Sequence, residues 1–392
     1  METKKGALPL LFAVMFLVMV GFGIIIPVMP FYAEQLGASP TQLGLLMAVY
    51  SLMQLLFAPM WGRISDRIGR KPVIMVGIAG LAISFFLMAL STQLWMLFAA
   101  RIIGGLLSSA NMPTVMAYVA DVTSNEDRGK GMGIIGAAVG LGFIFGPAIG
   151  GLFSQNNLAT PFYLAGASSL LTFVLVAIVL KESLSPEQRH THSTEKTSMW
   201  KAFSGPLSLL FILQLFVTLS LSGLEATFAY FAAERAGMGT VQLGYIFMIM
   251  GVAGAIVQGG LVGRLTKKWG EGAIIQAGII ISAIGFALIL RADSFATSAA
   301  FMTIFGIGNG IIRPSVSSLL TKKSKSGHGS TTGLLSSFDS LGRIVGPPLG
   351  GWLFSVSIGL PYISGIILSA VALVVYQIYA VQARKHQSTL AN

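Results

Sequence analysis

Five ionisable side chains stand inside long apolar stretches of this sequence, where a charge is costly unless it is paired or faces water. They are Arg101, Glu225, Arg313, Asp339 and Arg343. A carboxylate held in an apolar cavity favours its protonated form, so it can give up a proton when a cation competes for the same negative charge. This pattern indicates exchange of a proton for a cationic solute, with Glu225 as the leading site for both.

The carboxylates have simpler alternatives. Glu225 would have no exchange role if an arginine neutralised it permanently. Asp339 and Arg343 are spaced i, i+4 and can pair on one helical face. Arg313 is a second candidate partner for Asp339, since both are expected toward the same end of their helices. For Asp339 the sequence leaves two interpretations open, a structural or gating ion pair and a proton-coupling group.

The composition requires a membrane setting for these charges. Hydrophobic residues make up 54% of the 392 residues and charged residues only 10%, against roughly 25% charged in average soluble chains. The net charge of +11 resides in short loops, which favours anionic lipid over nucleic acid as the counterpart. The chain has no cysteine, and its four histidines lack metal-ligand spacing, so we expect no metal and no cofactor.

Windows of about twenty apolar residues predict an all-α integral membrane protein with twelve transmembrane helices. The predicted spans are 8–31, 41–62, 73–91, 94–120, 131–153, 160–181, 205–232, 240–263, 273–291, 295–320, 331–355 and 360–382. Placing both termini in the cytoplasm puts most of the 25 lysines and arginines in cytoplasmic loops, as the positive-inside rule requires. We expect a multi-pass protein of the cell membrane whose first span is not cleaved.

The sequence repeats after about 200 residues. Gly146 to Gly151 (GPAIGG) recurs as GPPLGG at 346–351, Pro113 corresponds to Pro314, and Gly62-Arg63 corresponds to Gly263-Arg264. Parallel repeats of this kind form two similar six-helix bundles with a substrate site between them near the midplane. The predicted domains are an N-terminal bundle (1–181), a cytoplasmic linker (182–204) and a C-terminal bundle (205–392).

The segment 62–72 carries the densest group of charges between two spans. Asp66 can accept hydrogen bonds from a helix N-terminus and from Arg67 or Arg70. The alternative role is topological, which explains the cations but not the carboxylate. With Gly62 and Gly69, the segment resembles the motif in the loop between helices 2 and 3 of the major facilitator superfamily. That resemblance implies a latch that holds the cytoplasmic side closed in the outward-facing state.

Residues 142–151 in the fifth span resemble a motif typical of antiporters of that superfamily. The small residues allow close backbone approach and Pro147 bends the helix, so this span can lie at a tight interface between the halves. Ordinary small-residue packing is the alternative. The residues concerned are Gly142, Gly146, Pro147, Gly150 and Gly151.

Further segments resemble the bacterial drug:proton antiporters of the NorA, Bmr and Blt type. They are Ile24–Pro30 in helix 1 and Ile312–Pro314 in helix 10. Arg101 with Gly105 resembles a motif of that superfamily to which a role in proton transfer is assigned. Gly310 departs from these relatives, which carry an acid three residues before the arginine of helix 10. Arg343 is grouped with the gating residues.

The candidate substrate site combines aromatic faces, which attract cations, with an adaptable methionine. Its members are Gln54, Phe143, Glu225, Phe228, Tyr245, Met248, Phe305, Arg313 and Phe338. Gln54 and Phe143 match pocket positions in the resembling family. Lipid-facing or core packing is the alternative for each aromatic.

These observations predict a proton-driven efflux antiporter for amphipathic, cationic or zwitterionic drugs, with proton coupling at Glu225, Asp339 and Arg101. The alternatives are an exporter of a specific metabolite, such as a sugar or amino acid, and a receptor or scaffold that transports nothing. No nucleotide-binding loop or nucleophile triad indicates an enzyme. The expected partners are a small-molecule substrate, protons and membrane lipids, and the expected oligomeric state is a monomer.

Overall fold

The computed structural model describes residues 7–124, 126–185, 207–323 and 328–391, and within these ranges the regular structure is helical. The helices are α1 (Ala7–Gln35), α2 (Pro40–Ile68), α3 (Arg70–Ala89), α4 (Leu94–Ser108), α5 (Asn111–Val122), α6 (Arg128–Phe153), α7 (Thr160–Val179), α8 (Ser208–Ala236), α9 (Thr240–Ile256), the π-helical turn η4 (Val257–Val262), α10 (Gly263–Ile289), α11 (Phe295–Lys323), α12 (His328–Val356) and α13 (Leu360–Ala391).

Ten helical stretches in the described ranges are long and apolar enough to cross a membrane. α4 and α5 form one of them, and the 50-residue stretch Thr240–Ile289 is long enough to cross twice. α12 lies outside the ten but has the length of a span. With that helix and the second crossing, the helices match the twelve predicted spans one for one, which confirms the all-helical membrane fold.

Two glycines break the helices where polar loops were expected. The predicted turn 62–72 is shorter in the structure, because α2 continues to Ile68 and α3 begins at Arg70. Gly69 between them has φ 112° and ψ 162°. Gly270 interrupts α10 with φ 79° and ψ 158°. Both lie in a backbone region that is essentially accessible only to glycine, so one residue suffices for each break.

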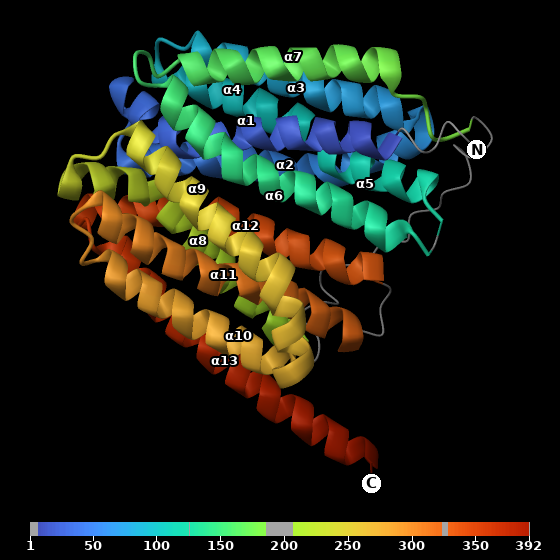
Figure 1. Cartoon of the computed structure of the whole chain (residues 1–392), viewed down its shortest axis with the longest axis vertical. Helices are drawn as coiled ribbons and strands as arrows, with labels where there is room; N and C mark the ends of the chain where they lie inside the picture. Colours follow the sequence, from blue (N-terminus) through green and yellow to red (C-terminus); the bar gives the residue numbers. More distant parts are fainter. Residues whose placement is uncertain (1–6, 125, 186–206, 324–327, 392) are drawn as a thin grey trace. The chain divides into compact units, whose positions relative to one another are not determined.

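The chain divides into two compact units. Unit 1 consists of Met1–Ala38, Val49–Glu195 and Gly239–Met248, and unit 2 of Ser39–Ala48, Lys196–Met238 and Ile249–Asn392. In unit 1, α3 lies against α4 and α7, and α1 lies against α6 (Figure 1). In unit 2, α8 packs against α12 and α13, and α10 packs against α11 (Figure 1).

Two short segments belong to a different unit from the one that the predicted domains imply. The first residues of α2 belong to unit 2 and those of α9 belong to unit 1. Residues 186–206, which include most of the predicted linker, lie outside the described residues. The domain boundaries 1–181, 182–204 and 205–392 therefore stay a prediction.

Glycines allow close packing of one helix pair in each unit. A Cβ atom added to Gly146 of α6 would lie 2.7 Å from the Cα atom of Gly23 in α1. In unit 2, a Cβ atom on Gly350 of α12 would lie 2.9 Å from the carbonyl oxygen of Gly223 in α8. Such distances are too short for any side chain, so the repeated glycine motifs hold helices together inside each unit.

Candidate functional site

Asp339 of α12 is the centre of a polar cluster in unit 2. Gln214 and Thr218 of α8 donate hydrogen bonds of 2.7 and 2.8 Å to its Oδ1 atom. The Arg313 guanidinium of α11 lies 2.8 Å from Oδ2. The Asp339 side chain is 13% exposed and that of Arg313 is 61% exposed. A mostly buried carboxylate is thus paired with an arginine that is itself largely accessible.

A second ion pair joins α8 to α12. The Nη1 atom of Arg343 donates to Oε2 of Glu225 over 3.3 Å, and the two side chains are 43% and 14% exposed. The i, i+4 pairing of Asp339 with Arg343 is therefore not the arrangement that the structure shows. Each carboxylate instead pairs with an arginine from another helix, because α8, α11 and α12 bring these partners within reach.

The intramembrane charge of unit 1 has a different setting. Arg101 is 6% exposed, and its guanidinium carbon lies 4.2 Å from the centre of the Tyr50 ring. The Tyr50 hydroxyl lies 2.5 Å from that of Ser108 and accepts a hydrogen bond of 3.2 Å from Gln54. The electron-rich ring face stabilises the buried cation, and the hydroxyl network fixes the ring. Gln54, a predicted pocket residue, belongs to this network.

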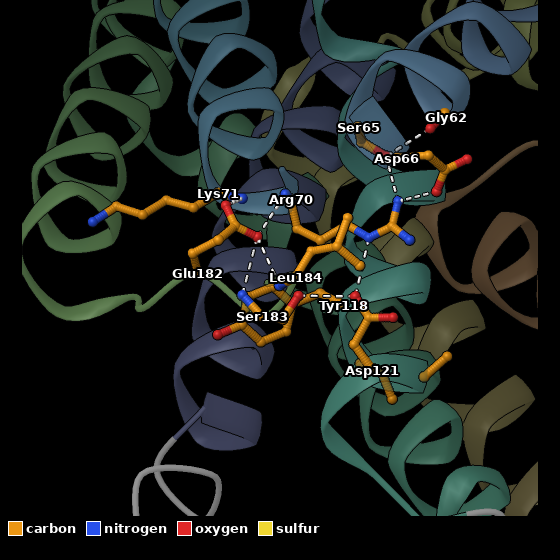
Figure 2. Close-up of polar contacts among 12 residues, drawn as sticks. Gly62, Ser65, Asp66, Arg70, Lys71, Tyr118, Asp121, Glu182, Ser183 and Leu184 are labelled. Atoms are coloured by element: carbon orange, nitrogen blue, oxygen red, sulfur yellow. Dashed lines mark hydrogen bonds and ion pairs between the residues drawn. The ribbon is translucent and has the colours of Figure 1, made fainter. Parts of the chain in front are cut away.

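A third cluster surrounds Arg70 at the start of α3 (Figure 2). Its Nη1 atom donates to Asp66 over 2.6 Å and to Ser65 over 2.7 Å, and its Nε atom donates to Asp121 over 3.1 Å. The Arg70 side chain is 5% exposed. Of the two arginines predicted as partners for Asp66, Arg70 forms the ion pair, while Arg67 is exposed. The predicted donors at a helix N-terminus bind Glu182 instead, at the start of α3.

The Glu182 carboxylate closes the same cluster by capping α3 (Figure 2). Its two oxygens accept hydrogen bonds from the backbone N–H groups of Arg70 and Lys71, at 2.8 and 3.1 Å. An anion at a helix N-terminus satisfies free donors and complements the helix dipole. Ser183 follows Glu182 and donates to Asp121 over 2.9 Å. The segment that follows α7 is thereby bound to the helix break at Gly69.

The predicted pocket residues occupy different environments. Phe228, Phe305 and Phe338 are buried in unit 2, where Phe305 meets Phe286 and Phe338 stacks on Phe211. Their burial favours the core-packing alternative. Phe143 and Tyr245 are 36% and 40% exposed. Met248 is half-buried.

The remaining motif residues lie along α2 and α6. Gly62 accepts a hydrogen bond from Ser65 through its carbonyl oxygen, at 2.7 Å. Gly142, Gly150 and Pro147 of α6 lie against α1, and Gly151 lies against the backbone of Thr240 within unit 1. The predicted interface between the halves is not decided by these contacts.

Sequence reasoning missed several residues of these clusters. Asp121 and Glu182 stand 51 and 112 residues from Arg70, and nothing in the sequence marks them as its partners. Gln214 and Thr218 are uncharged and resemble other polar residues of an apolar span. The repeat does place charged residues at the equivalent positions Asp121 and Lys322, but the sequence does not show that either one forms an ion pair.

The fold and the clusters define a class, a multi-pass helical membrane protein with sequence repeats and paired charges inside its spans. A family model described as Major Facilitator Superfamily matches residues 11–330 and 261–391. The chain belongs to the major facilitator superfamily, which confirms the resemblance of its loop and helix motifs. Membership places it among transporters.

Similar curated proteins cover almost the whole chain. Multidrug resistance protein 1 of Bacillus subtilis (strain 168) is 31% identical over 374 residues, 95% of this chain and 96% of its own length. Multidrug resistance protein 2 of the same strain is 32% identical over 92% of both chains. The quinolone resistance protein NorA of Staphylococcus aureus (strain MSSA476) is 29% identical over 92% of this chain and 93% of its own.

Two solved structures share the fold. The nucleoside transporter NupG superposes with a TM-score of 0.78 at 15% identity, covering 97% of this chain and 99% of its own. The human organic anion transporter MFSD10 (TETRAN) gives 0.70 at 22% identity, covering 95% and 99%. At these identities the likeness supports the fold alone.

Proposed function

We propose that this chain is a proton-coupled efflux antiporter for amphipathic, cationic or zwitterionic drugs. The observation that carries the proposal is a pair of mostly buried carboxylates, Glu225 and Asp339. Each is paired with a more exposed arginine, Glu225 with Arg343 (43% exposed) and Asp339 with Arg313 (61% exposed). The names of the curated relatives, two multidrug resistance proteins and a quinolone resistance protein, support drugs as the substrate class.

Exchange at Glu225 follows from its ion pair with Arg343. A proton on the carboxylate removes the charge that attracts Arg343, and the arginine is then free to turn toward solvent. A cationic drug that enters the pocket competes for the same negative charge and displaces the proton. Proton and drug therefore bind in alternation, which is the requirement for antiport.

Asp339 has a more protected setting. Gln214 and Thr218 continue to donate to its Oδ1 atom when Arg313 leaves Oδ2. We assign Asp339 to a second coupling step or to gating. Arg101, the third residue predicted for proton coupling, supports that step in this proposal by keeping a positive charge against the Tyr50 ring. Alternating access, cytoplasmic termini, a cell-membrane location, lipid contacts and a monomeric state are parts of the same proposal.

The test uses purified protein in liposomes that contain a pH-sensitive dye. We expect ethidium or a fluoroquinolone to discharge an imposed proton gradient through the wild-type protein. Glu225→Gln should abolish drug-driven proton movement, because the amide cannot exchange a proton, and weaken drug binding. Glu234→Gln is the matched control, since Glu234 lies on the same helix and is exposed. Intact coupling in Glu225→Gln would disprove the site assignment.

Export of a specific metabolite is the second candidate. Gly310 supports it, since the acid that the drug exporters carry at this position is missing. Discharge by a single sugar or amino acid and by none of several drugs would select this alternative. A protein that moves no solute in the same vesicles would instead indicate a receptor or scaffold.

A further inference from the structure

A pair of opposite charges lies beside the helix-breaking glycine of each unit. In unit 1, Arg70 directly follows Gly69, and its Nε atom lies 3.1 Å from Oδ2 of Asp121 at the end of α5. In unit 2, Glu271 follows Gly270, and its Oε1 atom pairs with Nζ of Lys322 at the end of α11. Each pair therefore joins a helix break to the end of a neighbouring helix.

The two pairs occupy equivalent positions in the sequence repeat. Adding 201 to residues 69, 70 and 121 gives Gly270, Glu271 and Lys322. The same shift relates Pro113 to Pro314, which are helix residues of α5 and α11. The glycine is identical in both halves and both charged partners are present, but the sign of each charge is reversed.

The reversal extends to a third position and leaves the burial pattern unchanged. Asp66, the other partner of Arg70, corresponds to Lys267. The residue after the glycine is the more buried partner in both units, with Arg70 5% and Glu271 13% exposed. Ser318 of α11 adds a hydrogen bond of 3.1 Å to Glu271. If these loops required only positive charge, there would be no reason for an ion pair to be kept in both units with its two signs exchanged.

We propose that Glu271 and Lys322 are positioning residues that anchor the break at Gly270 to α11, with inverted sign, as Arg70 and Asp121 anchor the break at Gly69 to α5. The attraction between the two charges anchors the helix break, whether the positive charge follows the glycine or lies on the neighbouring helix. Anchoring fixes the end of α11, the helix that also carries Arg313. The inference rests on the proposed function only where transport is its readout.

A charge exchange tests the anchor, and the lack of native cysteine allows a second readout. The variants are Glu271→Lys, Lys322→Glu and the double exchange, with Lys323→Glu as a control for charge on the same helix turn. Each is made in the wild-type chain and in a Thr266→Cys chain. The Thr266 hydroxyl is buried without a hydrogen-bond partner among the described residues, so its replacement removes no hydrogen bond there. Drug-driven proton release and the rate of maleimide labelling are measured.

Each single reversal should slow transport and speed labelling by roughly threefold or more, as expected for loss of a partly exposed pair and its replacement by repulsion. The double exchange should restore both rates, and Lys323→Glu should change neither. Failure of the double exchange to restore labelling would overturn the anchor, as would wild-type labelling in both single variants.

Two controls keep the outcome interpretable. If a single variant does not fold, as judged by its elution and thermal unfolding, the conservative variants Glu271→Asp and Lys322→Arg should fold and label at the wild-type rate. Wild-type protein that releases no protons with any drug contradicts the proposed function. The labelling rates still decide the anchor in that case, because they require no transport.

Discussion

Among the described residues, the least exposed charges of unit 1 are cations, whereas those of unit 2 are carboxylates. Arg70 and Arg101 are 4% and 6% exposed in unit 1. In unit 2 the side chains of Asp339, Glu225 and Glu271 are 13 to 14% exposed, and their cationic partners are 43 to 64% exposed. A guanidinium stays protonated in proteins, but a carboxylate can take up a proton and release its partner. Within the proposed function, Arg70 and Arg101 are fixed charges, Glu225 and Asp339 are the exchangeable ones, and Glu271 belongs to a structural anchor.

The largest expected effect comes from removing the buried cation of the unit 1 loop. Arg70→Ala leaves Asp66 and Asp121 close together without their shared counter-ion, which costs about 3–5 kcal/mol in the free energy of unfolding. Arg67→Ala, a neighbouring exposed arginine, should stay within about 0.5 kcal/mol of wild type. Thermal unfolding in detergent measures both. Equal stability of the two variants would contradict the structural role of Arg70.

The two helix breaks provide the next comparison. Gly69→Ala and Gly270→Ala both force alanine into a glycine-only backbone region, at a cost of about 1–3 kcal/mol. A Cβ atom on residue 69 would also collide with the Glu182 carboxylate, whereas one on residue 270 meets nothing within 4 Å. Gly69→Ala should therefore be the more destabilising variant in thermal unfolding.

A Glu182→Ala background sharpens that comparison. It removes the collision, so the difference between the two glycine variants should shrink. An unchanged difference would show that the extra cost at residue 69 does not come from Glu182.

Much of this organisation was accessible from sequence, and the reasons are physical. Long apolar stretches predicted the spans, because a helix needs about twenty such residues to cross a bilayer. The repeat of the GPAIGG segment predicted two related halves. For Asp339 the sequence offered both Arg343 and Arg313, and the structure selects Arg313. For Glu225 it offered no particular arginine, since helix neighbours rather than i, i+4 spacing decide which arginine reaches each carboxylate. Glu182 was missed because its role depends on a backbone turn 112 residues away.

A second pair of variants compares the two kinds of charge. Arg313→Ala leaves Asp339 mostly buried without its ion-pair partner, which costs about 1–2 kcal/mol while Gln214 and Thr218 still donate to it. The unfolding temperature relative to wild type measures the effect, and an unchanged temperature would contradict a stabilising role for the pair.

Asp121→Ala is the matched variant in unit 1. It leaves Arg70 buried with Asp66 as its remaining ion-pair partner among the described residues. Because Asp66 still neutralises the guanidinium, Asp121→Ala should destabilise the fold less than Arg70→Ala, which leaves two carboxylates without their shared counter-ion. Equal losses of stability in these two variants would contradict the role of Asp66 as a partner of Arg70.

The smallest effect is expected at the exposed cation of the unit 2 anchor. Lys322 is 64% exposed, so Lys322→Ala should cost less than about 1 kcal/mol, and salt should reduce even this because it screens exposed charges. Asp121→Ala, its repeat equivalent, should cost more at every salt concentration, because it acts on a guanidinium that is 5% exposed. Unfolding at low and high salt separates the two. If Lys322→Ala proved as destabilising as Asp121→Ala, the free energy of an anchor would depend on its place in the repeat rather than on the burial of its charges.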